Sequence, residues 1–204
     1  MASRKRKLAP AGSVSITALP YRPLRHFYHG QPGDPVSSAR FYWSKGSGPR
    51  ESVEGHFLGK RRVAGAESPT DTAAEVEPLL RPDVPQDYAD PDFLAASYMA
   101  RLPAEETAAF AQVTLSFPAA TNLHGPWQQA TSWLRDYYVK RVGVPVLAVL
   151  HAPFMAGSKS PVHLHALVLM RKLTAFGWLS THRELASDAG LKAAEASWRE
   201  WLSQ

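Results

Sequence analysis

The sequence predicts a domain of the α+β class, in which helices pack on a central antiparallel sheet. Two apolar segments of strand length, 146–151 and 162–170, follow each other with a short loop between them. Consecutive strands joined in this way pair as an antiparallel hairpin. Patterns typical of helices lie before and after the hairpin, over 126–141 and 181–202. This order of strands and helices indicates an α+β sandwich.

The helix over 126–141 is predicted from the spacing of its apolar residues. Those residues are Trp127, Trp133, Leu134, Tyr137 and Tyr138. Pro126 stands in the first turn, where a missing amide hydrogen has no cost, and Gly143 ends the segment. The segment 181–202 is interpreted as a broken helix that closes the chain.

Shorter elements are predicted in the rest of the chain. Strands are expected at 13–19 and 112–117, each ended by a proline. Short helices are expected at 37–43, 91–99 and 104–111. Residues 64–91 are rich in proline and acidic side chains, which favours a loop inserted in the domain.

Composition restricts the class of protein. The chain has 204 residues, no cysteine and an excess of basic over acidic residues of 23 − 18 = 5. The absence of cysteine excludes a disulfide scaffold, a cysteine zinc site and a cysteine nucleophile. Since no apolar run is long enough to span a membrane and no secretory signal is visible, we expect a cytoplasmic protein without membrane insertion. We expect a flexible basic tail over 1–12 and a single domain over 13–204.

Three histidines lie in the predicted hairpin. His163 and His165 are two residues apart on one strand, so both imidazoles leave the same face. His151 ends the preceding strand and returns to the same neighbourhood across the hairpin. Three neutral imidazoles at one point make a metal site with open positions for water or substrate. The alternative is a pair of histidines that are hydrogen-bonded or face the solvent.

The hairpin and the residues after it resemble the MobA/MobL-type plasmid mobilisation relaxases. Members of that family carry an upstream His, a His-x-His strand, an Arg six residues later and a Gly-aromatic turn. Here these are His151, His163-Leu164-His165, Arg171 and Gly177-Trp178. The closing WREWL (198–202) is similar to the Trp-containing helix that ends the family's catalytic domain.

The resemblance is firm over 112–204 and thin over 14–111. VTLSFP (113–118) and GHFLGKRRV (55–63) stand where the family has a strand ending in Leu-Pro and a short aromatic-basic hairpin. Two features depart from the pattern. Pro161-Val162 replaces the family's Asn-Pro, and Ser97-Tyr98 stands where an assisting Glu is usual, with Glu105 or Glu106 as substitutes.

The resemblance implies an HUH-endonuclease-like fold, a central antiparallel sheet flanked by helices. It implies that His151, His163 and His165 hold a divalent metal, Mg or Mn. The implied activity is nicking and rejoining of single-stranded DNA at a plasmid transfer origin, with conjugation accessory or coupling proteins as further partners. Two alternatives stay open: an HUH-type replication initiator, and a decayed relaxase that binds DNA as a non-catalytic accessory protein.

The implied nucleophile is a tyrosine that forms a 5′-phosphotyrosine. A phenol with a pKa of about 10 is a weak nucleophile at neutral pH, so it needs a metal or a base. Tyr42, in SSARFYWSKG, fits the family's position best, and Tyr28 and Tyr21 are the rivals.

Basic residues complete the predicted site. Arg171 is expected to steady the end of the sheet or a DNA phosphate, and Lys60, Arg61 and Arg62 to contact DNA. Phosphate contacts of this kind give an affinity that falls as salt rises.

Overall fold

The computed structural model describes residues 28–29, 36–42, 49–63, 70–103, 106 and 108–204. The predicted tail over 1–12 and strand over 13–19 lie outside these residues. The division into a tail and one domain therefore stays a prediction. No described helix has the length and apolar character that crossing a membrane requires.

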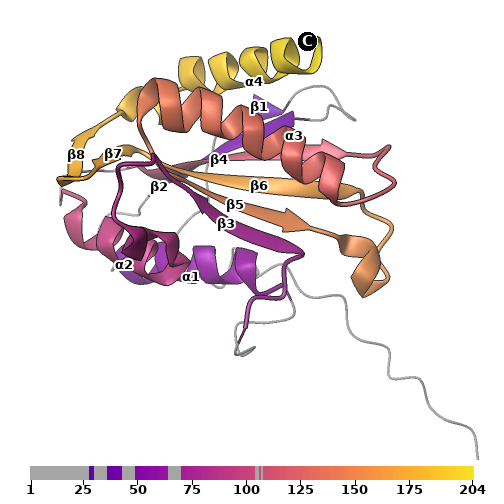
Figure 1. The fold of residues 1–204 in the computed structure, drawn as a ribbon, viewed down its shortest axis with the longest axis horizontal. Helices are drawn as coiled ribbons and strands as arrows, with labels where there is room; N and C mark the ends of the chain where they lie inside the picture. Colours follow the sequence, from indigo (N-terminus) through magenta and orange to yellow (C-terminus); the bar gives the residue numbers. More distant parts are fainter. Residues whose placement is uncertain (1–27, 30–35, 43–48, 64–69, 104–105, 107) are drawn as a thin grey trace, which may run out of the picture.

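The described strands form a six-stranded sheet in which every neighbouring pair is antiparallel (Figure 1). Its order is β1-β2-β4-β6-β5-β3. The strands are β1 (Tyr28–His29), β2 (Val36–Tyr42), β3 (Glu75–Leu79), β4 (Ala108–Phe117), β5 (Val146–His151) and β6 (Val162–Leu169). A separate ribbon consists of β7 (Arg171–Thr174) and β8 (Gly177–Thr181). The sheet places β5 and β6 side by side, both inside its edges.

Helices cover both faces of the sheet (Figure 1). One face carries α3 (His124–Leu134), its π-helical continuation η3 (Arg135–Val142) and α4 (Asp188–Leu202). The other face carries α1 (Pro49–Arg61) and α2 (Pro91–Arg101). Short 3-10 helices are η2 (Gln86–Ala89), η4 (Pro153–Ala156) and η5 (Arg183–Ala186). The two layers confirm the predicted α+β class, an antiparallel sheet flanked by helices.

Each face has its own hydrophobic core. Trp133 and Trp198 meet edge to face at 5.2 Å between ring centroids and anchor the α3 and α4 side. Phe57, Phe110 and Leu167 belong to the core under α1 and α2. Alternate residues of each strand therefore serve different cores, as the two-residue repeat of a strand requires.

The hairpin and most of the second-half elements are confirmed. β5 and β6 pair from Val146 to His151, as predicted. The helix predicted at 91–99 is α2, and the strand predicted at 112–117 is the second half of β4. The helix predicted at 126–141 is continuous, although its second half has π-helical hydrogen bonds, and Gly143 ends it with φ of 87°.

Four local predictions are wrong. Residues 37–43 were expected to be helical, but 37–42 belong to β2, which pairs with β4 along its whole length. The helix expected at 104–111 is replaced by β4 from Ala108 onward. Sheet pairing decides both cases, because cross-strand contacts outweigh weak local helix propensity.

The other two errors concern 55–63 and 64–91. The segment GHFLGKRRV is not a hairpin, because α1 runs through it to Arg61. The proline-rich segment contains β3, which pairs with β5 at the edge of the sheet. An edge strand tolerates Pro78, and Leu79 of the same strand is fully buried.

Candidate metal centre

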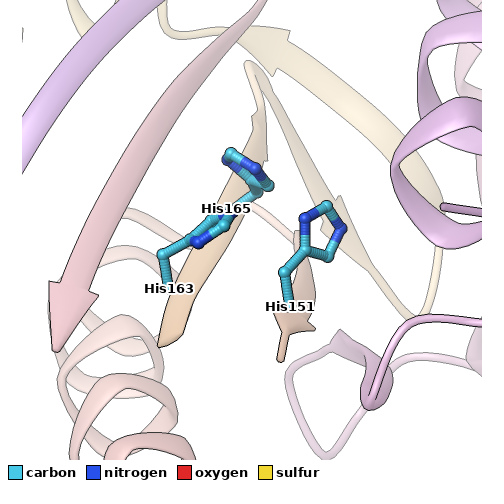
Figure 2. Close-up of side chains that lie close together, drawn as sticks. All are labelled: His151, His163 and His165. Atoms are coloured by element: carbon cyan, nitrogen blue, oxygen red, sulfur yellow. The ribbon is translucent and has the colours of Figure 1, made fainter. Parts of the chain in front are cut away.

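Strand register brings the three histidines together. His151 on β5 is the direct cross-strand partner of His163 on β6, and His165 lies two residues further along the same face. Figure 2 shows the three rings gathered over these two strands. Ring centroids are 4.8 to 5.1 Å apart, and one nitrogen from each ring lies within 4.8 Å of the others. The arrangement is a three-imidazole cluster that can bind a metal ion.

Backbone carbonyls fix the proton positions of two of these rings. His151 Nε2 lies 2.7 Å from the carbonyl oxygen of Lys60, and His163 Nδ1 lies 2.9 Å from that of Pro161. A carbonyl oxygen only accepts, so these two nitrogens carry the protons. The lone pairs are left on His151 Nδ1 and His163 Nε2. Partners of this kind commonly orient histidine ligands of metals.

The third ring contacts three side chains. His165 Nδ1 lies 2.9 Å from Thr114 Oγ1 and 3.4 Å from Gln112 Nε2, and its Nε2 lies 3.5 Å from Lys60 Nζ. The Gln112 amide also donates to Thr114 Oγ1, at 3.3 Å, so the shorter threonine contact is taken as the partner of Nδ1. A lysine ammonium only donates, so Nε2 holds the lone pair and Nδ1–H donates to the threonine hydroxyl. All three rings then present a lone pair from neutral imidazole, the form that ligates metals.

Two further side chains form a series of hydrogen bonds that ends at Thr114. Gln112 Nε2 donates to Thr114 Oγ1 at 3.3 Å, and His56 Nε2 donates to Gln112 Oε1 at 3.0 Å. These residues were not predicted as part of the site. A signal was present in the sequence, because Gln112, Thr114 and Ser116 alternate with apolar residues on one face of the predicted strand.

Burial lowers the pKa of every histidine in this region. It lowers the pKa of His56 and of His151 to about 4, and that of His165 well below its usual value. The pKa of His163 falls for the same reason. The positive charge of Lys60 acts in the same direction on all four. The rings are therefore neutral at physiological pH and fit a divalent cation.

These shifts predict how stability depends on pH. Below about pH 6.5 the unfolded chain binds protons on its histidines while the folded chain does not, so protonation favours unfolding. The contribution of these histidines to the free energy of unfolding of the metal-free chain is expected to be constant above about pH 7 and to fall as the pH drops toward 4. Urea titrations at several pH values measure it, and His56→Gln should reduce the slope. A stability that stays constant down to pH 5 would contradict the shifts.

Tyr42 does not lie near the cluster. Its cross-strand partner is Ala108, whereas the partner of His165 on the same strand β4 is Thr114. Six residues of β4 separate the two positions, which is about 20 Å at the rise of a strand. That distance is far longer than a tyrosine side chain. The register therefore does not bring Tyr42 to this cluster, and its role as the nucleophile stays a prediction.

Of the two rival tyrosines, the structure describes the position of Tyr28 but not that of Tyr21. Tyr28 lies on β1, three strands from β6, which is about 14 Å across the sheet. Tyr21 lies outside the described residues. The four tyrosines whose side chains are described contact other parts of the molecule: Tyr88, Tyr98, Tyr137 and Tyr138.

Arg61 has a structural role. Its guanidinium is buried and forms ion pairs with Asp71, at 3.0 Å, and with Asp92 at the start of α2. These pairs tie the end of α1 to the following segment and to α2. Carboxylates occupy the hydrogen-bonding edges of the guanidinium in this structure, so the predicted contact of Arg61 with DNA stays a prediction that these ion pairs do not favour.

Loss of this contact should cost stability. Arg61→Ala removes a buried partner of two carboxylates and is expected to lower the free energy of unfolding by about 1–2 kcal/mol, a reduced figure because Asp92 remains hydrated. Urea unfolding measures the change. Arg81→Ala, which removes an exposed pair with Asp83, serves as the control and should have little effect. An equal effect of both substitutions would contradict the structural role of Arg61.

Of the other basic residues predicted to contact DNA, Arg171 and Arg62 contact groups outside the histidine cluster, and Lys60 contacts the cluster. Arg171 donates to the carbonyls of Leu179, at 2.9 Å, and of Arg101. It lies six residues beyond His165 and steadies the far end of the sheet, and its predicted contact with a DNA phosphate stays a prediction. Arg62 lies 3.9 Å from Asp71, and Lys60 alone of this group contacts the histidines.

Of the two acidic substitutes suggested by the sequence, Glu106 is not at the site, and Glu105 lies outside the described residues. Glu106 is buried and accepts from Arg183 at 2.9 Å, next to η5. Ser97 accepts from the indole of Trp178, at 2.9 Å, and Tyr98 donates to the carbonyl of Ala109. These contacts attach α2 to the β7–β8 ribbon and to β4, far from the histidines.

Comparison with known proteins supports the fold. No family model matches the chain, and no curated protein matches it. A solved structure from Staphylococcus aureus, described under the molecular basis of vancomycin resistance transfer, has a similar fold with a TM-score of 0.52. The two share 13% sequence identity, over 64% of this chain and 68% of that one. The chain therefore shares the fold of a protein studied in the transfer of antibiotic resistance.

Proposed function

We propose that this protein is a metal-dependent DNA relaxase, which nicks and rejoins one DNA strand during plasmid mobilisation. The observation that carries the proposal is the convergence of three imidazole lone pairs on the neighbouring strands β5 and β6. Support also comes from the sequence resemblance to mobilisation relaxases and from the fold shared with a protein of vancomycin resistance transfer.

The chain's own residues supply the metal ligands. His151 Nδ1, His163 Nε2 and His165 Nε2 would hold a divalent ion, which would act as a Lewis acid on a phosphoryl oxygen when bound. Mg or Mn is the ion that the resemblance implies, and imidazole ligands also suit zinc or nickel. The carbonyls of Lys60 and Pro161 and the hydroxyl of Thr114 keep these rings oriented.

The proposed reaction transfers a phosphoryl group to a tyrosine. The phenol oxygen bonds to phosphorus, the bond from phosphorus to the 3′ oxygen breaks, and the phenol proton ends on that oxygen. The products are a 5′-phosphotyrosine and a free 3′-hydroxyl, and the reverse reaction rejoins the strand. Because Tyr42 lies about 20 Å along the sheet from His165 and Tyr28 lies three strands away, we propose Tyr21, the remaining tyrosine that the resemblance allows, as the nucleophile.

The loop beside the cluster supports single-stranded DNA as the substrate. It follows His151 directly and exposes Phe154, at 58%, and Met155, at 72%. Exposed aromatic side chains stack on unpaired bases, and a basic residue nearby attracts the backbone. Lys159 lies exposed in the same loop.

The test is a search for a covalent protein–DNA bond. The protein is incubated with Mn²⁺ and a pool of random single-stranded oligonucleotides, and species that resist SDS are isolated. A relaxase yields adducts that are lost on proteolysis, and sequencing of the trapped DNA gives the preferred site. DNA binding without any adduct under several metals would overturn the enzyme assignment.

The second candidate function is a DNA-binding accessory protein that no longer cuts. The position of Tyr42, the tyrosine that best fits the family pattern, favours it, since that residue lies about 20 Å along the sheet from His165. An accessory protein would still bind single-stranded DNA in a salt-dependent way. The adduct experiment separates the two functions.

A further inference from the structure

We propose that the Lys60 ammonium competes with the divalent metal ion for the lone pair of His165. When DNA binds, a phosphate pairs with the ammonium and moves it away from His165. The proposal rests on the metal site of the proposed function. It adds a coupling between metal binding and DNA binding that the three histidines alone do not provide.

Lys60 contacts two of the three histidines by different atoms. Its backbone carbonyl accepts from His151 Nε2 at 2.7 Å, while its ammonium faces His165 Nε2 at 3.5 Å. The residue lies in the last turn of α1, next to the anchored Arg61. The backbone is therefore held at the cluster, and only the side chain is free to move.

One lone pair cannot serve both cations. An imidazole nitrogen without a proton has a single lone pair, which here points at the Lys60 ammonium. A metal ion bound to His165 Nε2 needs the same lone pair. The ammonium must therefore leave before His165 can ligate the ion. The free energy needed to displace the ammonium lowers the affinity of the site for metal.

The surroundings of the Lys60 ammonium indicate why a DNA phosphate would be a favourable partner for it. Among the described residues no carboxylate pairs with its ammonium, whereas Arg61 beside it has two such partners. A partly buried ammonium without an anion is costly, so an incoming phosphate is a favourable partner. A phosphate that pairs with Lys60 vacates the lone pair of His165. Metal and DNA should then strengthen each other's binding by the same factor.

The experiment measures Mn²⁺ affinity by calorimetry in the full chain without DNA. Lys60→Met keeps the length of the side chain and the backbone carbonyl but removes the ammonium. It is expected to bind Mn²⁺ at least tenfold more tightly than the wild type. Lys140→Met, which removes an exposed lysine from η3 on the other face of the sheet, is the matched control and should leave the affinity unchanged.

A second measurement tests the coupling. Saturating single-stranded oligonucleotide should raise the Mn²⁺ affinity of the wild type and of Lys140→Met, but not that of Lys60→Met. An unchanged or weaker Mn²⁺ affinity in Lys60→Met, with the same result in Lys60→Gln, would overturn the competition. Failure of every variant to bind Mn²⁺ would overturn the metal site itself. Loss of nicking alone would leave the competition standing, because the readout is metal binding.

Discussion

Binding of Mn²⁺ is expected to disappear when His163 and His165 are both replaced by alanine. The double substitution removes two of the three imidazole lone pairs and leaves His151 as a single ligand, which cannot hold the ion at micromolar concentration. His151→Ala alone should weaken binding severely. Thr114→Val should weaken it by about 10- to 100-fold, because it removes the partner that orients His165. Isothermal titration calorimetry measures all four proteins.

The control for these variants is His124→Ala. His124 lies at the start of α3, on the other face of the sheet, and is exposed. Its loss should leave Mn²⁺ affinity unchanged. Mn²⁺ binding of wild-type strength in the His163→Ala, His165→Ala double variant would show that the ion binds elsewhere.

The covalent DNA adduct is expected to vanish in Tyr21→Phe and to persist in Tyr42→Phe. Each substitution removes one oxygen, so folding and DNA binding should survive in both. Tyr42 is far from the histidines along the sheet. Denaturing gels with labelled DNA measure the adduct, and its loss should be complete because no other group replaces the phenol oxygen.

Two further variants complete the comparison. Tyr28→Phe should keep the adduct, since β1 lies three strands from β6. Tyr88→Phe, on the α2 side of the molecule, is the control for nonspecific effects of removing a phenol. An adduct that is lost only in Tyr42→Phe would mean that β2 moves to the cluster on DNA binding.

The sequence was sufficient to predict the hairpin and its histidines. An apolar strand on each side of a short loop fixes an antiparallel pair, and the two-residue spacing of His163 and His165 fixes their common face. These inferences depend on local periodicity alone. The same is true of α2 and of the helix that begins at His124.

The strands β2 and β3 were not predictable in this way. Their residues have no strong alternation, and each becomes a strand because a neighbour, β4 or β5, offers unpaired backbone groups. The place of Lys60 was missed for a related reason. Its contact with His165 joins residues 105 positions apart, and nothing in the local pattern of α1 points to it.

The interior position of the two histidine-bearing strands also bears on which ions the site accepts. β6 is paired on both sides, by β4 and β5, and β5 is paired by β6 and β3. Backbone amides in such strands exchange with solvent chiefly when the whole domain unfolds. The spacing of the three nitrogens is therefore set before an ion arrives and cannot relax far around it. Discrimination between ions should then follow ionic radius and bond length, and an ion of the wrong size should dissociate quickly rather than reshape the sheet.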